Sequence, residues 1–338
     1  MISQQVGAVA IGRNEGARLR ACLESLLAMV DRVVYVDSGS SDDSVAVAES
    51  LGVTVVHLDP DEGFTAGKAR NLGARALLDA KTPPAFIQFV DGDCVLVSGW
   101  LEQALRRLGE DSGLAVVAGW RRERFPQATI FNRQCDMEWN TPIGEAAAVG
   151  GDALYRSAAF ASVGGFDPAF ICGEEPELCY RLRQAHWRIE RLDVDMTLHD
   201  AAISRWSQWW KRVVRTGWAF AEGAATYGAT QEAYNRREAL RIALWGVAYP
   251  LAVLLLLLLA LVLGEAAPLL LALALLALLP LMTARIALYR GQAFDDPLPH
   301  GLLYGALVML GKVPEAVGAW RYLRSRARSE TARIIEYK

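Results

Sequence analysis

Two long stretches of the chain contain no charged residue, and they restrict the possible folds more than any other part of the sequence. They cover residues 242–264 and 266–284, and Glu265 is the one charge between them. Each has the length of a helix that crosses the hydrocarbon core of a bilayer. A buried helical hairpin in a water-soluble core is the alternative, but such helices normally keep a polar face, which these stretches lack. We therefore predict two transmembrane helices within residues 239–285.

Basic residues flank this hairpin on both sides. Arg236, Arg237 and Arg241 precede the first stretch, and Arg285 and Arg290 follow the second. Lys and Arg accumulate on the cytoplasmic side of membrane proteins. We therefore expect a multi-pass protein of the inner or plasma membrane, with its N-terminal domain and its C-terminus in the cytoplasm.

A third apolar stretch, residues 302–310, is too short to span before Lys312. A third crossing would also export a basic tail, which contains Arg321, Arg324, Arg326, Arg328 and Arg333. We interpret residues 302–323 as an interfacial or re-entrant helix within a C-terminal region of residues 286–338. A true crossing by this segment stays open.

Residues 1–200 alternate strand-like apolar runs with helical patterns. This alternation predicts an α/β domain with a mostly parallel sheet and right-handed crossovers. Ligands of such sheets bind beyond the carboxyl ends of the strands. Polar residues follow three of the predicted strands at that edge, and they are Asn14 with Glu15, Asp37, and Asp91 with Asp93.

The segment FIQFVDGDC, residues 86–94, combines a buried strand with two carboxylates. Taken alone, Asp91, Gly92 and Asp93 could form only a turn. At the end of a strand, however, two carboxylates can hold a divalent cation together with a ribose or phosphate. Lys68, Arg70 and Asn71 lie near the start of a helix expected at 65–80, where backbone N–H groups also favour anions.

Several classes of protein are disfavoured. A net charge of -3 and a pI near 5.9 argue against a nucleic-acid binder. The first strand is followed by no GxGxxG motif, and the chain has no GxxxxGK[ST] motif, which disfavours Rossmann dehydrogenases and P-loop NTPases. The five cysteines form no CxxC pair, so reduced thiols are expected rather than a zinc site or disulfides. The N-terminus has no basic region of the kind that begins a signal peptide.

An acidic pair and a histidine stand out in the second half of the domain. Glu174 and Glu175 precede an amphipathic helix. Acidic residues there could simply complement the helix dipole, or one of them could act as a catalytic base. His199 ends a strand-like run, and a lone histidine is usually structural, but a metal-binding pair is predicted upstream.

Residues 204–218, SRWSQWWKRVVRTGW, are both basic and aromatic. Trp206, Trp209, Trp210 and Val213 recur at helical spacing, which is typical of a helix in a membrane interface. We therefore expect interfacial helices at 201–238. The alternatives are a helix that packs its tryptophans on the globular domain and, less favoured beside two membrane spans, stacking on nucleic-acid bases.

Together these segments resemble the membrane-associated glycosyltransferases of family 2, which have the Rossmann-like GT-A fold. The resemblance covers roughly residues 5–220 and rests on the order and spacing of several motifs. These are AIGRNEGARLRACLESLL, VVYVDSGSSDDS, AGKARNLGARAL, FVDGDC, and GGFDPAFICGEEPELCYRLR followed by the histidine of TLHD. It implies inverting transfer of a sugar from a nucleotide-diphosphate sugar, assisted by Mg or Mn.

The resemblance also implies roles for individual positions. The nucleotide sugar would be bound by Asn14, Glu15, Asp37, Lys68, Arg70, Asn71 and Asp91. The metal would be held by Asp93 with Asp91 and His199. Glu175 falls at the position of the general base, but the family usually has Asp there, so Glu174 stays an alternative. The acceptor and the membrane would lie toward Trp206, Trp209, Trp210 and Arg215.

We expect transfer of a single sugar to a lipid or polyprenyl-linked acceptor at the cytoplasmic face, in glycolipid or polysaccharide biosynthesis. A processive polysaccharide synthase is disfavoured because its QxxRW element is not clearly present and only two spans are predicted. Two further functions stay open, those of a nucleotidyltransferase of related fold and of a catalytically silent membrane scaffold. The sugar, the base, the acceptor and the oligomeric state stay open as well.

Overall fold

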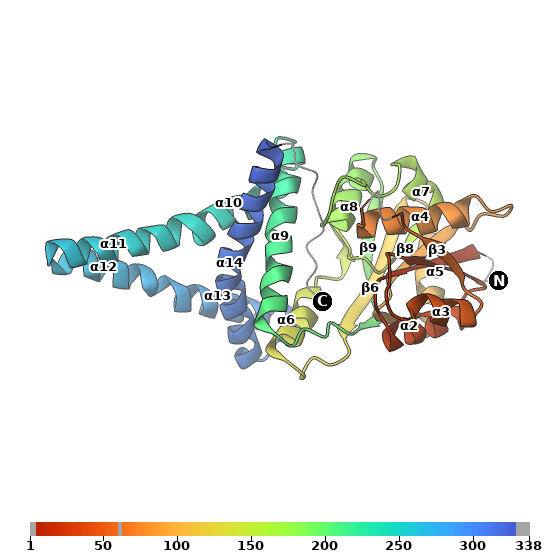
Figure 1. The fold of residues 1–338 in the computed structure, drawn as a ribbon, viewed down its shortest axis with the longest axis horizontal. Coiled ribbons are helices and arrows are strands. Elements are labelled where there is room, and N and C mark those ends of the chain that lie inside the picture. Colours follow the sequence, from red (N-terminus) through yellow and green to blue (C-terminus); the bar gives the residue numbers. More distant parts are fainter. Residues whose placement is uncertain (1–4, 60–62, 329–338) are drawn as a thin grey trace. The chain divides into compact units, whose positions relative to one another are not determined.

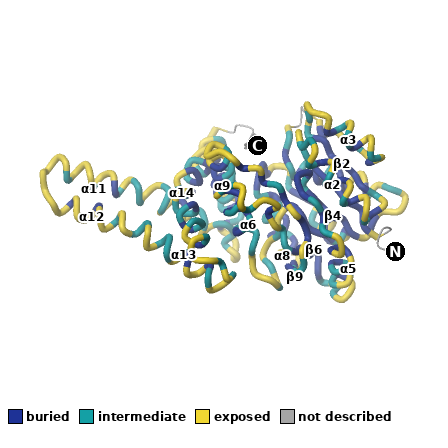
Figure 2. The backbone as a smooth tube through the Cα atoms, turned by 90° about the horizontal axis from the view of Figure 1, so that it is seen from below, coloured by how far each residue is buried: buried dark blue, intermediate teal, exposed yellow. Residues whose placement is uncertain are grey.

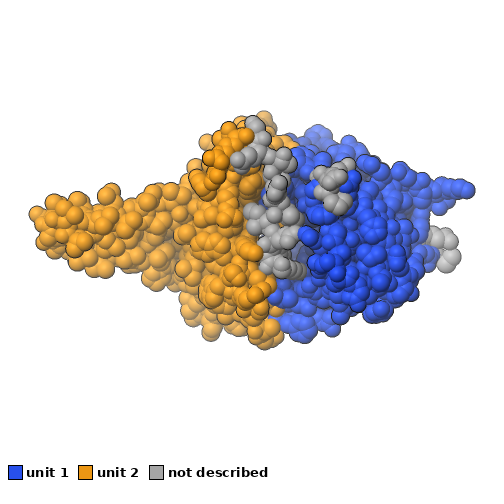
Figure 3. All heavy atoms as spheres, in the orientation of Figure 1, with its two compact units in different colours: residues 1–125, 138–202 blue, residues 126–137, 203–338 orange. Residues whose placement is uncertain are grey.

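The computed structural model describes residues 5–59 and 63–328, and the chain divides into two compact units (Figure 3). Residues 1–125 and 138–202 form the first, which we call the α/β unit. Residues 126–137 and 203–338 form the second, which we call the helical unit. Arg333 of the predicted basic tail lies outside the described residues.

The α/β unit is built on one nine-stranded sheet (Figure 1). Its strands are β1 (Val6–Gly12), β2 (Arg32–Asp37), β3 (Thr54–His57), β4 (Phe86–Asp91), β5 (Cys94–Leu96), β6 (Leu114–Glu123), β7 (Gly144–Glu145), β8 (Ala153–Arg156) and β9 (Arg188–His199). Its helices are α2 (Ala17–Leu27), α3 (Ser44–Ser50), α4 (Ala66–Leu78), α5 (Trp100–Glu110), α7 (Ser157–Ser162) and α8 (Glu174–Gln184).

The strand order is β3-β2-β1-β4-β8-β6-β9-β5, with β7 paired to β9. The first four strands are parallel, as the alternation of strands and helices predicts. In the second half the sheet is mixed, because β8 runs antiparallel to both β4 and β6 and β5 runs antiparallel to β9. The predicted α/β class is confirmed, and the antiparallel strands β5, β7 and β8 are the short ones.

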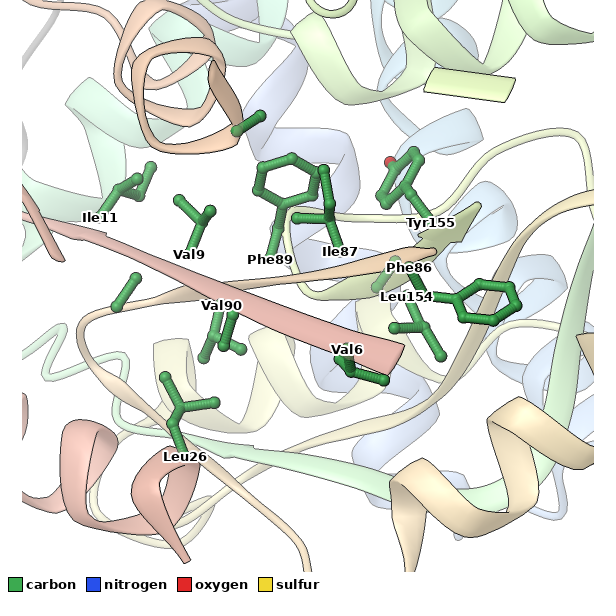
Figure 4. Close-up of a cluster of buried hydrophobic side chains, with 14 of the residues drawn as sticks. Val6, Val9, Ile11, Leu26, Phe86, Ile87, Phe89, Val90, Leu154 and Tyr155 are labelled. Carbon is green, nitrogen blue, oxygen red and sulfur yellow. The ribbon is translucent and has the colours of Figure 1, made fainter. Parts of the chain in front are cut away.

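The central strands β1 and β4 carry apolar side chains on both faces (Figure 4). A strand that is covered on both faces needs a nearly continuous apolar run, and the five residues from Phe86 to Val90 are all buried and all apolar except Gln88. Helix α4 approaches β1 so closely that a Cβ at Gly73 would collide with the side chain of Val9. This packing fixes the start of α4 beside the carboxyl edge of the sheet.

The helical unit contains no strand among the residues described. Its helices are α6 (Ile130–Trp139), whose last two residues belong to the α/β unit, α9 (Trp206–Tyr227), α10 (Arg236–Ile242), the π-helical turn η2 (Ala243–Ala248), α11 (Tyr249–Leu263), α12 (Ala266–Leu276), α13 (Leu278–Phe294) and α14 (Leu298–Ala327).

Three helical segments are long and apolar enough to cross a membrane, namely Arg236–Leu263, Ala266–Phe294 and Leu298–Ala327. The first covers the predicted span 242–264 except Gly264, the second contains the span 266–284, and both extend by several residues at their outer ends. Most residues of α11 and α12 are exposed (Figure 2), as expected of helices that contact lipid. The third is much longer than the apolar stretch 302–310, so its length and composition permit a crossing.

Candidate active site

The candidate site lies where strands β4, β6 and β9 of the α/β unit end and β5 begins. Asp91 is the last residue of β4, and Asp93 follows it by two positions. Glu123 and His199 end the parallel strands β6 and β9 and are partners in their register. The β5–β9 pairing also sets Cys94 opposite His199. Residues distant in sequence therefore meet at one edge of the sheet.

A buried arginine holds three carboxylates together. Arg70 is 2% exposed, and its Nη2 lies 2.8 Å from Asp91 Oδ1. Its Nη1 lies 2.9 Å from Glu174 Oε1 and 3.1 Å from Glu175 Oε1. One guanidinium therefore faces three acidic groups, and it ties α4 to the ends of β4 and the start of α8. Burial lowers the pKa of Arg70, but Glu175, Asp91 and Glu174 outweigh burial and raise it.

The two adjacent glutamates differ in access. Glu174 is 2% exposed, and its Oε2 has no hydrogen-bond partner among the described residues. Glu175 is 18% exposed and forms an ion pair with Arg70. Burial, and next the neighbouring Glu174, raise the pKa of Glu175 to about 7. The geometry therefore favours Glu175 as the residue that can reach a ligand.

Asp91 is held in its ionised form. Besides Arg70, the Nη2 of Arg121 lies 3.2 Å from Asp91 Oδ2. The backbone N–H of Asp91 donates to Asp152 Oδ1 at 2.9 Å. Arg121 Nη1 lies 3.5 Å from Asp152 Oδ2. Burial raises the pKa of Asp91, but Arg70 and then Arg121 keep it well below its usual range.

His199 links Asp93 to Glu123. Its Nδ1 lies 3.2 Å from Glu123 Oε2, and its Nε2 lies 3.3 Å from Asp93 Oδ2. Burial, and next Arg121, lower the pKa of His199, which favours the neutral imidazole. If Nδ1–H donates to Glu123, the Nε2 lone pair faces the Asp93 carboxylate. Two acceptors at that distance require a shared cation or proton.

These donors suit a hard divalent cation. One group of possible ligand atoms within 4.8 Å of one another comes from Asp93, Cys94 and His199, and a second comes from Asp91, Cys94 and Asp152. Carboxylate oxygens and a neutral imidazole with an anchored second nitrogen are usual ligands. Burial raises the pKa of the Cys94 thiol, which makes it a poor ligand for Mg or Mn. Asp93 and His199 of the predicted trio therefore lie close enough to share an ion, whereas Asp91 groups with Asp152 and is paired with Arg70 and Arg121.

The predicted nucleotide residues Asn14 and Asp37 organise the loop after β2. Asn14 Oδ1 accepts from the Ser41 backbone N–H at 2.7 Å. Asp37 is 3% exposed, and its Oδ2 accepts from the backbone N–H groups of Gly39 and Ser40 at 3.0 Å each. Both side chains thus shape the edge of the sheet beside β1 and β2.

The other predicted nucleotide residues have protein partners as well. Glu15 pairs with Arg18 at 2.8 Å. The amide of Asn71 donates to the Phe166 carbonyl at 2.7 Å and accepts from its N–H at 2.9 Å, which ties α4 to the segment before α8. Lys68 lies in the first turn of α4, where its backbone N–H donates to Thr65 Oγ1 at 3.2 Å.

Three residues of the cluster were not among the predicted site residues, and they are Arg121, Glu123 and Asp152. Arg121 and Glu123 lie in the RRER segment at the end of β6, and charged residues at a strand end are the signal that could have indicated them. Asp152 follows Gly151, where a Cβ would collide with the Arg70 guanidinium. Because Gly151 has no side chain, the Arg70 guanidinium can pack against its backbone.

The tryptophans of α9 divide into two groups. Trp209 is 3% exposed, and its Nε1 donates to Gln134 Oε1 at 2.7 Å within the helical unit. Trp206 and Trp210 are 56% and 42% exposed. Arg215 is half-buried on the same helix. Trp209 and Trp218, which is 6% exposed, therefore pack inside the unit, and Trp206 and Trp210 are available to a partner.

A mixed α/β sheet with acidic residues beyond its central strand is the arrangement expected of a GT-A fold. Residues 9–157 match the profile of "Glycosyl transferase family 2", and this domain belongs to that family. The predicted family and fold are therefore confirmed.

Two curated relatives have names that refer to glycosyl transfer or to polysaccharide biosynthesis. The chain is 30% identical over 204 residues to the pre-mycofactocin glycosyltransferase of Mycobacterium tuberculosis (strain ATCC 25618 / H37Rv). That match covers 56% of this chain and 41% of that protein. The chain is also 28% identical over 196 residues to the succinoglycan biosynthesis protein ExoA of Rhizobium meliloti. That match covers 53% of this chain and 58% of that protein. The chain thus spans about half the length of these relatives.

One solved structure resembles nearly the whole chain. It is the mannosyltransferase PcManGT from Pyrobaculum calidifontis in complex with GDP-Man and Mn2+. The TM-score is 0.58 at 16% sequence identity, and the match covers 94% of this chain and 87% of that one. At 16% identity this similarity shows a shared fold alone.

Proposed function

We propose that this protein is an inverting glycosyltransferase that moves a single sugar from a nucleotide-diphosphate sugar to an acceptor. The observation that carries the proposal is the position of Glu175, a partly exposed carboxylate 3.1 Å from Arg70 in a family 2 domain. The same arginine contacts Asp91 at the end of β4. The names of the relatives, and the GDP-Man and Mn2+ of a protein with a similar fold, support a nucleotide-sugar donor.

In this proposal the diphosphate lies beyond the ends of β4 and β9. Asp93 and His199, with Asp91 beside them, would hold Mn or Mg. When bound, such an ion stabilises the negative charge that develops on a diphosphate leaving group. Asn14, Glu15 and Asp37 would border the nucleotide at the edge of β1 and β2.

Glu175 is proposed as the general base. Its carboxylate takes the proton of the acceptor hydroxyl while that oxygen bonds to the anomeric carbon and the bond from that carbon to the diphosphate oxygen breaks. A pKa of about 7 suits this role, because a base works best when its pKa lies near the working pH. Glu174 does not take the proton, since it is buried against Arg70 and serves to hold that arginine in place.

We further propose that the acceptor is a lipid or polyprenyl-linked molecule at the cytoplasmic face of a membrane. Three long apolar helices and the exposed Trp206 and Trp210 support a membrane location for the helical unit. The name of the Rhizobium relative points to polysaccharide assembly, so a lipid-linked glycan is included in this acceptor class.

Thermal-shift screening of nucleoside diphosphates, with and without Mn2+, tests the donor proposal, because a ligand of the native state raises its apparent stability. We expect at least one diphosphate to raise the melting temperature, and to do so more with Mn2+. An Asp93→Asn variant should lose the additional rise in melting temperature that depends on Mn2+. A panel with no stabilising nucleotide would contradict the proposal.

A further inference from the structure

Helix α14 is the segment whose relation to a membrane the sequence leaves open. Residues 298–311 contain no Asp, Glu, Lys or Arg, but the next four residues include both Lys312 and Glu315. These two side chains pair at 2.6 Å. Fourteen helical residues extend only about 21 Å, which is shorter than a hydrocarbon core of about 30 Å. The whole helix is long enough to cross, but its uncharged half alone is too short, so a crossing would place the Lys312–Glu315 pair in the hydrocarbon core.

One face of α14 is occupied by α9. A Cβ at Gly318 would collide with the Val214 carbonyl oxygen, and a Cβ at Gly217 would collide with the Glu315 backbone. Further along, the rings of Trp218 and Tyr322 meet edge to face at 5.5 Å. Gly311 lies against Val213 at one end of this interface and Tyr322 against Trp218 at the other, so the two helices run parallel and in close contact.

A second face of α14 is apolar and exposed. Its members are Leu302, Leu310, Val313, Trp320 and Leu323, each between 38% and 57% exposed. At helical spacing they fall within an arc about 140° wide. The guanidinium of Arg324 lies 5.5 Å from the ring centroid of Trp320 and falls within the same arc, so the apolar stripe carries a cationic group at its C-terminal end. That is the composition of a helix lying in a membrane interface.

The α11–α12 hairpin meets α14 at its base. A Cβ at Gly246 would collide with the Lys312 carbonyl, and Gly301 lies against Ala287. From Gly246 to Leu263 the first leg of the hairpin is about 27 Å long. Figure 1 shows α9 and α14 running across the direction of this hairpin, and in Figure 2 the hairpin again extends away from them.

These relations fix the orientation of the unit in a bilayer. If the hairpin stands across the membrane, helices that run across it lie along the membrane surface. The leg beyond Gly246 then nearly spans the hydrocarbon core, and its base lies at the near interface, where α14 is. The exposed tryptophans 206, 210 and 320 are of the type that is enriched at that level.

We propose that α14 lies in the near membrane interface beside α9, with its apolar stripe in the bilayer, and that the chain crosses the membrane only twice. The partner of this stripe is an anionic bilayer surface, because Arg205, Lys211, Arg321 and Arg324 add positive charge around the helix pair. The end of α14 then lies on the same side as the α/β unit. This inference does not depend on glycosyl transfer.

Single-cysteine labelling tests the topology, and the native cysteines do not interfere because all five are buried. Glu49→Cys, Glu265→Cys and Ala327→Cys would each be exposed to a membrane-impermeant maleimide in sealed vesicles of known orientation, with the parent protein as background. We expect Glu49→Cys and Ala327→Cys to label on one side and Glu265→Cys on the other. Labelling of Ala327→Cys together with Glu265→Cys, or of all three on one side, would overturn the proposal.

Spin labels test the depth of α14 in vesicles that contain anionic phospholipid. A label at Val313→Cys, on the apolar stripe, should collide mainly with oxygen dissolved in the bilayer. A matched label at Arg321→Cys, off the stripe, should collide mainly with a water-soluble nickel reagent. Equal exposure of both labels to the nickel reagent would contradict the proposal. Dipolar broadening between Val313→Cys labels would show a second copy on this face and would overturn it as well.

Discussion

Arg70 lies 2.9 Å from Glu174, and both side chains are 2% exposed. This contact separates the two adjacent glutamates, because Glu174 is committed to a buried ion pair and Glu175 keeps access to the site. The arginine also reaches Asp91, so one side chain connects the proposed base with the end of β4.

Glu174→Gln should mainly reduce stability. The change removes one charge from a buried pair, and breaking such a pair costs about 3–5 kcal/mol. The matched control is Glu24→Gln, which removes one partner of the exposed Arg20–Glu24 pair at 3.6 Å and should change stability by less than about 1 kcal/mol. Denaturant unfolding of both variants measures the difference. Equal stability of the two variants would contradict a structural role for Glu174.

The rate of the chemical step should rise with pH through about 7. Burial and the neighbouring Glu174 raise the pKa of Glu175, and only its deprotonated form accepts the acceptor proton. The effect on stability has the opposite sign. Between pH 4.5 and about pH 7 Glu175 keeps a proton in the folded protein that it releases in the unfolded chain. The contribution of Glu175 to the free energy of unfolding therefore falls as pH rises through that window. A rate independent of pH from about 5.5 to 8 would contradict the assignment.

Glu123→Gln should weaken metal binding without removing a proposed ligand. Glu123 lies 3.2 Å from His199 Nδ1 and orients the imidazole toward Asp93. Loss of such an outer partner typically lowers metal affinity about 10–100-fold. Electron paramagnetic resonance of free Mn2+ measures the affinity, and the exposed Glu102→Gln serves as control. Unchanged affinity in the Glu123 variant would place the ion elsewhere.

Gly318→Leu should destabilise the helical unit. Any Cβ at this position collides with the Val214 carbonyl, so α9 and α14 would have to separate. Overpacking of this kind costs about 1–3 kcal/mol. Ala327→Leu at the exposed end of α14 is the matched control. The outcome that contradicts this packing is an identical unfolding transition for the two variants in detergent.

The sequence predicted those parts of the site that follow strands with regular helical crossovers. Asp91 and Asp93 follow a buried strand, and their position at the sheet edge needs only that strand to be recognised. Arg121 and Glu123 come from β6 and Asp152 immediately precedes β8. No local pattern shows that β8 inserts antiparallel between β4 and β6. Their meeting is a consequence of the mixed half of the sheet.

The same limit applies to Arg70 and to α14. The position of Arg70 near a helix start suggested a group that faces the ligand, but its burial under three carboxylates depends on contacts with α8, about a hundred residues away. For α14, the apolar stretch was visible in the sequence. The glycine contacts with α9 and the hairpin are what distinguish its faces, and they are tertiary.

The most direct measurement of the central claim is single-turnover sugar transfer by Glu175→Gln, with the donor that the thermal-shift screen identifies. We predict that transfer falls by about 10²–10⁴-fold while the Mn2+-dependent stabilisation by the nucleoside diphosphate is unchanged. Transfer at the parental rate in this variant would contradict the assignment of Glu175 as the base.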